Sequence, residues 1–352
     1  MSVVCKFVFT PHAVHAGFLL FKNPYNAQMN IVTAFEALAV EGMEGGHDRV
    51  IETVLSKLFV RGDKVHKAYK HRVADFADLT DREVRREYIA EDFFWNNAMA
   101  PEVYLELRGV KRVGDEFVHV PLGEDWYIVM QKIDTEKDLM RAIMHGTLCK
   151  EDLVEYVRVL MERLTSLSAA RRPPLEAFFE RGAAHVHAEV LGTCDWAYTA
   201  DEFLSRADVD RAGSLMRRAL ESEQYFTGQM DSIAVVIDTN AENILFLDGG
   251  VSFIDVMPPK DAWRVHDRYF AICRTSADIG ALSDCELAEA LHESYALVPP
   301  PEAVRVVYEI AAALIQVPYR KMVGREDLSV KYANFVRLRS NDLALLLDEA
   351  GV

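Results

Sequence analysis

Three polar side chains, Asp238, Asn243 and Asp255, lie in one short stretch of the chain whose apolar runs predict strands. The apolar run 233–237 ends at Asp238, and Asn243 follows five residues later. Phosphoryl transfer needs such a set of groups. One carboxylate orients the attacking hydroxyl and accepts its proton, while an amide oxygen and a second carboxylate hold Mg²⁺ beside the phosphates. The sequence therefore predicts Asp238 as the catalytic base and Asn243 and Asp255 as metal ligands.

A β-hairpin is expected to position these side chains. Two apolar runs, 244–247 and 251–254, flank a turn signal at 248–250 that contains two glycines, and glycine tolerates the positive φ of tight hairpin turns. The hairpin then carries Asn243 at its start and Asp255 at its end. Protein kinases use the same layout, D-x-x-x-x-N followed by a hairpin that ends in a metal-binding Asp. The alternative is a surface hairpin with acidic ends, because short motifs also arise by chance.

Composition limits the classes of protein that fit. The chain has 352 residues, half of them hydrophobic, which suits two lobes or domains with a large core. The formal net charge of -16 repels phosphate backbones and argues against nucleic-acid binding. No apolar run reaches membrane-spanning length, so no membrane association is expected. The five cysteines are scattered without a Cys-x-x-Cys pair, and no secretory signal is present, which predicts a reducing, cytoplasmic setting.

Residues 46–133 predict a small antiparallel sheet with one helix. The helix is expected to begin with Thr80 as N-cap and Glu83 at the capping-box position, and to end near Met99. Residues 1–45 form an N-terminal extension to which the pattern assigns no firm structure. The strands are expected at 54–60, 64–69, 103–110, 116–120 and 126–133.

Lys67 lies on the second expected strand and could grip the α- and β-phosphates of ATP, as a strand lysine does in kinase-like folds. Such a lysine needs a helix carboxylate to hold its ammonium toward the phosphates. The expected helix carries Glu87, Glu91 and Asp92. The alternative is a solvated helix face and a strand lysine that only aids solubility.

Residues 134–352 predict a mainly helical region in which the Asp238 hairpin is embedded. The junction at 131–135 is expected to act as a hinge, where backbone groups, including those of Gln131 and Ile133, could pair with adenine. The helices are expected at 137–144, 151–167, 175–181, 200–205, 212–223, 267–274, 284–295, 301–315 and 340–348.

Other nucleotide and metal motifs are missing from the sequence. It contains no GxxxxGK[ST], no GxGxxG and no GxSxG, so neither a P-loop, a Rossmann site nor a hydrolase elbow is supported. A zinc site built from His185, His187 and Cys194 is an alternative that the spacing disfavours, because the His-x-His pair lacks the usual separation and no fourth ligand is evident.

Several separate segments agree, in order and spacing, with one known pattern. They read ETVLSKLFV at 52–60, GDKVHKAYK at 62–70, WNNAMAPEVY at 95–104, VIDTNAEN at 236–243, FID at 253–255 and DAWRVHD at 261–267, and Pro318-Tyr319-Arg320 also fits. On these segments the chain resembles the aminoglycoside phosphotransferase and choline kinase-like superfamily. It is most similar to a branch of uncharacterised bacterial phosphotransferase-like proteins.

The resemblance implies an α+β, two-lobed protein kinase-like fold. A small antiparallel β N-lobe with one helix would span 46–133, and a mainly helical C-lobe with the hairpin would span 134–352. It also implies ATP, or another nucleoside triphosphate, and Mg²⁺ as cofactors, with transfer of the γ-phosphate to a hydroxyl of a small molecule. A protein substrate is disfavoured because no D-F-G to A-P-E activation-loop signature follows Asp255.

The resemblance also refines the nucleotide-binding residues. It places the carboxylate partner of Lys67 at Asp92, with Glu91 as the neighbouring candidate, and it adds Ser56 to the cofactor-binding residues. Gln131 and Ile133 complete this set at the hinge.

The chain departs from the family pattern at three places. Val236-Ile237 stands where the family has His-Gly, Val256-Met257-Pro258 lacks the acidic residue that often follows the metal Asp, and Leu167-Ser168 replaces a Phe-His pair. The alternative function is therefore a pseudokinase, a regulatory nucleotide-binding module without turnover. Antibiotic modification is a third possibility that the net acidity does not select, and the sequence names neither the acceptor nor the oligomeric state.

Overall fold

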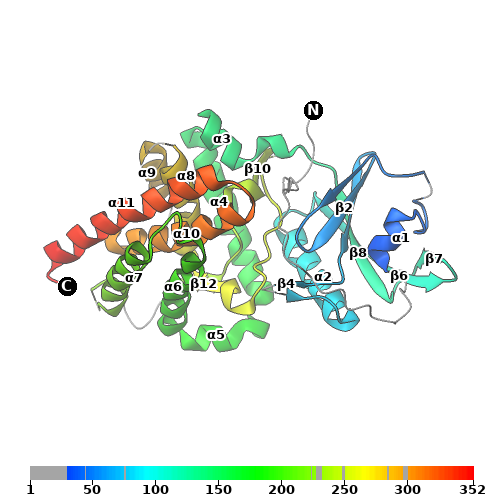
Figure 1. The fold of residues 1–352 in the computed structure, drawn as a ribbon, viewed down its shortest axis with the longest axis horizontal. Coiled ribbons are helices and arrows are strands. Elements are labelled where there is room, and N and C mark those ends of the chain that lie inside the picture. Colours follow the sequence, from blue (N-terminus) through cyan, green and yellow to red (C-terminus); the bar gives the residue numbers. More distant parts are fainter. Residues whose placement is uncertain are drawn as a thin grey trace. The chain divides into compact units, whose positions relative to one another are not determined.

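The chain divides into two compact units, Met1–Thr135 and Glu136–Val352, and Figure 1 labels most of their helices and several of their strands. In the part that the computed structural model describes, no helix is long and apolar enough to cross a membrane. Most of the expected N-terminal extension, residues 1–29, lies outside the described residues. The residues that the structure describes are 30–43, 45–74, 77–222, 224–226, 232–247, 250–283, 285–295 and 300–352.

The first unit contains a six-stranded sheet in the order β1-β2-β3-β8-β6-β7, in which every neighbouring pair is antiparallel. Lys67 lies on an inner strand of this sheet, opposite Leu58 on one side and Ile128 on the other. An inner strand has both edges hydrogen-bonded, so the backbone at Lys67 is fixed. The strands are β1 (Arg49–Glu52), β2 (Ser56–Arg61), β3 (Lys64–Tyr69), β8 (Asp125–Gln131), β6 (Tyr104–Val113) and β7 (Glu116–His119), with β4 (Val73–Ala74) and β5 (Ala77–Asp78) as a separate short pair.

Helices cover both faces of the sheet. Side chains alternate along a strand, so His66 and Ala68 belong to one face of β3 and Lys67 and Tyr69 to the other. The short helix α1 (Ile31–Glu36) packs on the first face, where Phe35 contacts the His66 ring and shares an apolar core with Ala68. The longer helix α2 (Arg82–Met99) supplies a buried side chain to the Lys67 face.

The start of α2 differs from the sequence prediction. Asp81, not Thr80, is the N-cap, and its carboxylate accepts hydrogen bonds from the amides of Glu83 and Val84. Thr80 is already engaged, because its hydroxyl donates to Asp78 at 2.6 Å. Aspartate caps a helix as well as threonine does, so the chain uses the carboxylate that follows.

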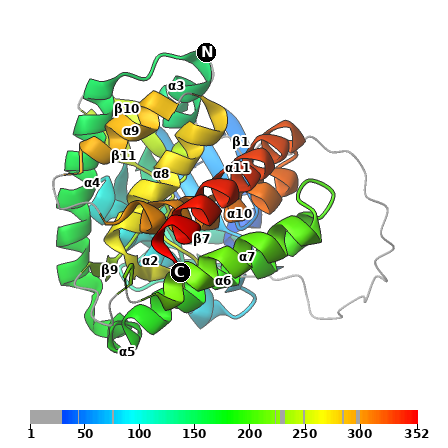
Figure 2. The same cartoon turned by 90° about the vertical axis from the view of Figure 1, so that its left-hand side faces the viewer.

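The second unit is mainly helical around α10 (Glu302–Met322), most of whose residues are buried. It packs against α6 (Ala183–Ala197), α8 (Arg268–Leu282) and α11 (Glu326–Ala350), and Figure 2 shows α10 and α11 lying side by side. The remaining helices are α3 (Leu139–His145), α4 (Lys150–Arg171), α5 (Glu176–Arg181), α7 (Arg206–Glu221) and α9 (Cys285–Glu293).

The helices of this unit differ in part from those predicted from the sequence. The whole of α6 was missed, because its exposed face carries the small residues Ala184, Ala188 and Gly192 and therefore shows no clear polar pattern. Residues 200–205, expected to be helical, contain no α-helix: a short 3₁₀ helix, Tyr198–Ala200, ends there and a turn follows it. The last helix, α11, begins at Glu326, well before the expected start at residue 340.

The strand pairing of the expected hairpin is confirmed, while residues 248 and 249 of its expected turn lie outside the described residues. Strand β10 (Ile244–Leu247) pairs antiparallel with β11 (Gly250–Phe253). The strand before it, β9 (Ile233–Val235), pairs instead with β12 (Val265–Asp267), which the sequence analysis did not expect as a strand. The two short pairs together fix both ends of the segment that carries Asp238.

Candidate active site

The candidate groups occur in both units, and in the first unit Lys67 and Asp92 are in contact. The Lys67 Nζ lies 3.0 Å from Asp92 Oδ2, and the two side chains are only 8% and 5% exposed. Of the two neighbouring helix carboxylates predicted from the sequence, Asp92 therefore meets the lysine. Glu91 instead accepts a hydrogen bond from the Trp95 indole at 3.2 Å.

Two further side chains hold Asp92, and neither was singled out from the sequence. The Tyr69 hydroxyl donates to Asp92 Oδ2 at 2.6 Å, and the Asn96 amide donates to Oδ1 at 3.0 Å. Spacing could have identified both. Tyr69 follows Lys67 by two residues on a strand, and Asn96 follows Asp92 by four on a helix, so each pair shares one face. The carboxylate is thus hydrogen-bonded through both of its oxygens.

Ser56 lies on the same face of the sheet as Lys67, because it is paired with Tyr69 across β2 and β3. Its hydroxyl is 2.9 Å from the Thr53 hydroxyl, and its amide also donates to Thr53. The Ser56 side chain therefore closes the turn before β2 in this structure.

The hinge residues occupy the end of β8 and the segment after it. The Gln131 side chain belongs to the opposite face from Lys67, since its strand partner is Lys64, whose ammonium donates to Gln131 Oε1 at 2.7 Å. The Gln131 amide donates to the Val103 carbonyl at 2.7 Å. Ile133 follows the strand and is partly buried.

In the second unit, backbone hydrogen bonds bring the three predicted residues of the motif together. The Asp238 amide donates to the Val256 carbonyl at 2.9 Å, and the Ile254 amide donates to the Asn243 carbonyl at 2.9 Å. The Asn243 side-chain amide donates to the Asp255 carbonyl at 3.3 Å. The loop that carries Asp238 and the two ends of the hairpin therefore form one hydrogen-bonded group.

Asp255 has a left-handed backbone conformation, with φ of 53°. Aspartate is one of the few residues other than glycine that adopt this conformation, and such strain persists only where the surroundings impose it. The Asp255 side chain is exposed, and the Asp255 carbonyl accepts its hydrogen bond from the buried Asn243 side chain. Carboxylate and amide oxygens suit Mg²⁺, which is commonly held by one or two protein oxygens together with phosphates. The residues present therefore fit this ion.

The zinc alternative has no geometric support. His185 is fully buried, and its Nε2 lies 3.0 Å from the carbonyl oxygens of Ala262 and Val265. His187 packs against the Phe226 ring. Among the residues that the structure describes, no group of three His, Cys, Asp or Glu side chains could hold a metal ion.

One face of α8 holds the loop that contains Asp238. The Ala271 carbonyl accepts from the Thr239 hydroxyl at 3.0 Å, and Asp278 Oδ2 accepts from the Ala241 amide at 3.0 Å. Between these two positions on the helix, Arg274 Nη2 donates to Asp238 Oδ1 at 2.5 Å. Burial raises the pKa of the Asp278 carboxyl, which also accepts from a tyrosine hydroxyl of α11.

A buried arginine of α10 supports the same loop. Arg320 Nη2 donates to Asn240 Oδ1 at 3.1 Å, and its Nη1 lies 3.0 Å from Glu242. Arg320 is completely buried, although it carries a charge, so its position depends on these partners.

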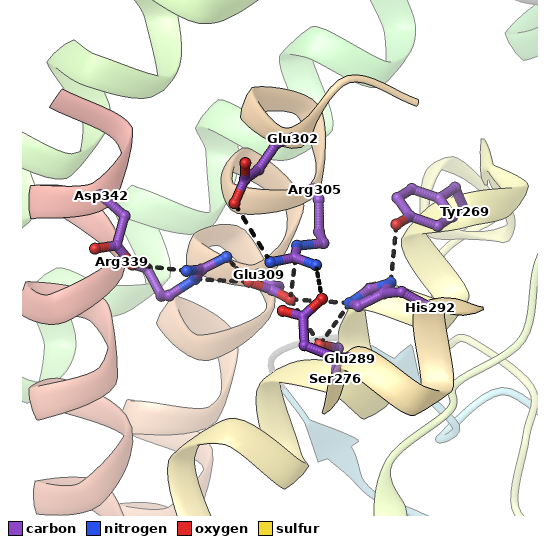
Figure 3. A network of polar contacts seen from close by, with 9 residues as sticks. All are labelled: Tyr269, Ser276, Glu289, His292, Glu302, Arg305, Glu309, Arg339 and Asp342. Atoms are coloured by element: carbon purple, nitrogen blue, oxygen red, sulfur yellow. Dashed lines mark hydrogen bonds and ion pairs between the residues drawn. The ribbon is translucent and has the colours of Figure 1, made fainter. Parts of the chain in front are cut away.

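The opposite face of α8 is fixed by a buried polar network (Figure 3). Ser276 donates to Glu309 Oε1 at 2.6 Å, and Tyr269 hydrogen-bonds His292 at 2.8 Å. Arg339 from α11 donates to Glu309 Oε2 at 2.7 Å. The helix that carries Arg274 is therefore held on both sides.

No protein-family model matches the chain, and no curated protein matches its sequence. Solved structures do resemble it. An aminoglycoside 2′-phosphotransferase-IIIa in its GDP complex has a TM-score of 0.50 at 11% identity, with 84% of this chain and 94% of that chain covered. A choline kinase from Cryptosporidium parvum Iowa II has a TM-score of 0.49 at 11% identity, covering 90% and 95%. The likeness to the aminoglycoside phosphotransferase, at this identity, concerns the fold: the chain has the α+β protein kinase-like fold that its sequence predicted.

Proposed function

We propose that the chain is an ATP- and Mg²⁺-dependent phosphotransferase that moves the γ-phosphate of ATP to a hydroxyl group of a small molecule. The observation that carries this proposal is the hydrogen-bonded group formed by the Asp238 loop and the hairpin between Asn243 and Asp255. It supplies a carboxylate, an amide oxygen and a second carboxylate in the order that phosphoryl transfer uses.

Asp238 acts as the base in this proposal. Its side chain is 33% exposed, so a substrate hydroxyl can reach it, and its backbone is fixed through Val256. Asn243 and Asp255 would hold Mg²⁺, which when bound neutralises phosphate charge.

Lys67 binds the α- and β-phosphates, and Asp92 orients it. The lysine ammonium has three donors, and Asp92 accepts one of them. Tyr69 and Asn96 keep the carboxylate in place while the ammonium binds phosphate.

The proposal also covers the identity of the donor nucleotide and the chemical class of the acceptor. The aminoglycoside phosphotransferase of similar fold was solved with GDP, so GTP is compared with ATP as the donor. The acceptor is a small hydroxylated molecule, with no nucleic acid or membrane surface as partner. The net charge of -16 supports this choice, because it repels nucleic-acid backbones and anionic membrane surfaces.

A nucleotide-binding module without turnover is the second candidate. Two observations favour it: Asp238 is ion-paired with Arg274, and the residues before it, Val236 and Ile237, are buried apolar side chains. This candidate predicts binding of Mg-ATP without transfer.

The test is a screen of hydroxylated small molecules with Mg-ATP or Mg-GTP, read by product mass. An acceptor that gains one phosphoryl group, with release of the nucleoside diphosphate, supports the phosphotransferase. Protein that is folded and stabilised by Mg-ATP but phosphorylates no acceptor supports the second candidate. A melting temperature that millimolar Mg-ATP does not raise contradicts both, because a ligand that binds only the folded state must stabilise it.

A further inference from the structure

The carboxylate of Asp238 is held on one side only. Its Oδ1 accepts from Arg274 Nη2 at 2.5 Å and from the Asn240 amide at 3.3 Å. No described residue donates a hydrogen bond to its Oδ2. The two oxygens are therefore not equivalent: Oδ1 is fixed by the protein, and Oδ2 remains open to a substrate.

The guanidinium that fixes Oδ1 comes from a rigid helix. Ala271, Arg274 and Asp278 follow one another at spacings of three and four residues, so they lie on one face of α8. That face meets Thr239, Asp238 and Ala241 of the loop. The Arg274 side chain is only 17% exposed, which limits the positions that it can take.

We propose that Arg274 is a positioning residue that holds Oδ1 of Asp238 and leaves Oδ2 to accept the proton of the acceptor hydroxyl. This inference rests on the proposed phosphotransferase function. In the reaction the acceptor oxygen forms a bond to the γ-phosphorus, the bond from that phosphorus to the β,γ-bridging oxygen breaks, and ADP leaves with the electron pair. The acceptor proton passes to Asp238 Oδ2 and then to solvent.

An arginine suits this position for a chemical reason. Its guanidinium stays protonated in proteins, so it cannot take the proton in place of Asp238. Its planar donors hold one oxygen in a defined direction, whereas a lysine ammonium directs its partner less strictly. The contact from Asn240 supports the same oxygen from within the loop.

The opposite role for Arg274 is a lock. If its ion pair with Asp238 had to break before catalysis, removal of the guanidinium would raise turnover. Positioning predicts that the same removal lowers turnover, so the sign of the effect separates the two roles.

The experiment compares Arg274→Ala, Arg274→Lys and the wild type with the acceptor found in the screen. Misplacement of a reacting group by about 1 Å can cost about 10²-fold in rate. We therefore expect kcat of Arg274→Ala to fall by about 10²-fold, with KM for Mg-ATP and melting temperature near the wild type. Arg274→Lys should recover part of the rate, because it keeps a donor and the charge.

Recovery of the rate by added guanidinium ion is a second measurement. A purely structural role of Arg274 predicts no such recovery. Added at concentrations that leave the melting temperature unaltered, guanidinium ion should raise the rate of Arg274→Ala and not that of Asp238→Asn. The matched control is Arg337→Ala, which removes an arginine that pairs with Asp208 at 3.0 Å in the same unit and should leave kcat unchanged.

The outcomes distinguish failure of the positioning role of Arg274 from failure of the proposed phosphotransferase function. A wild type that transfers phosphate, with Arg274→Ala equally fast or faster, overturns the positioning role alone. A wild type that transfers nothing to any acceptor overturns the proposed function and this role with it. If Arg274→Ala does not fold, Arg274→Lys must still show lowered kcat at unchanged KM for Mg-ATP, and a wild-type rate in that variant contradicts the inference.

Discussion

Lys67 and Asp92 form an ion pair that is buried at both ends, with 3.0 Å between the ammonium and the carboxylate oxygen. The pair joins the inner strand β3 to helix α2, so the position of the lysine depends on the helix. Burying two charges is favourable only where each finds its partner. The contacts of Asp92 with Tyr69 and Asn96 meet that condition.

Asp92→Ala should destabilise the protein strongly, because it leaves the Lys67 ammonium buried without its partner carboxylate. Breaking a buried pair in this way typically costs about 3–5 kcal/mol. The measurement is the free energy of unfolding in denaturant. Glu87→Ala is the control, since Glu87 is an exposed carboxylate of the same helix and its removal should change stability by about 0.5 kcal/mol or less. Equal losses of unfolding free energy in the two variants would show that the Lys67–Asp92 ion pair does not stabilise the fold.

Asp255→Asn should weaken nucleotide binding in the presence of Mg²⁺ and affect metal-free nucleotide binding much less. Asparagine accepts the left-handed backbone conformation of Asp255, so the variant removes the charge and not the local fold. The measurement is the dissociation constant of ATP by titration calorimetry, with Mg²⁺ and with chelator. A loss of the same size under both conditions would mean that Asp255 is structural and binds no metal.

The buried polar network beside α8, which contains Glu309, should make the free energy of unfolding depend on pH in the acidic range. Burial alone would raise the pKa of Glu309, but the hydrogen bond from His292 and the charge of Arg339 outweigh it and lower the pKa to about 2 from 4.5. A carboxyl whose pKa is lower in the folded state stabilises the fold above its unfolded pKa. Its contribution is lost as the pH falls from 4.5 toward 2.

Glu309→Gln should therefore be less stable than the wild type at pH 7, by an amount on the order of 3 kcal/mol. Its free energy of unfolding should also change less between pH 4.5 and pH 2, the window set by the two pKa values. Asp342→Asn is the control, because Asp342 pairs with the same Arg339 but is more exposed. Parallel pH profiles for wild type and Glu309→Gln would contradict the assignment.

The sequence could predict the hairpin with Asn243 and Asp255 because its signals are local. Two apolar runs, a turn with two glycines and the D-x-x-x-x-N spacing lie within about twenty residues. Helix α6 could not be predicted in the same way, since its exposed face carries Ala184, Ala188 and Gly192, and these small residues hide the polar periodicity on which such a prediction depends.

The supports of Asp238 could not be predicted because they come from distant parts of the chain. Arg274 follows Asp238 by 36 residues, and Arg320 follows Asn240 by 80. No local pattern links such pairs, and only the packing of α8 and α10 against the loop brings them together. The residues that could do chemistry were thus visible in the sequence, while the residues that hold them were not.

Asp238→Asn tests the central claim most directly. The change keeps the size of the side chain and removes the base, and general base catalysis is typically worth ~10²–10⁴ in rate. We expect kcat for phosphate transfer to the acceptor to fall within that range, while the melting temperature and the Mg-ATP dissociation constant stay near the wild-type values. Transfer by Asp238→Asn at nearly the full wild-type rate would contradict the account, because Asp238 would then not be the base.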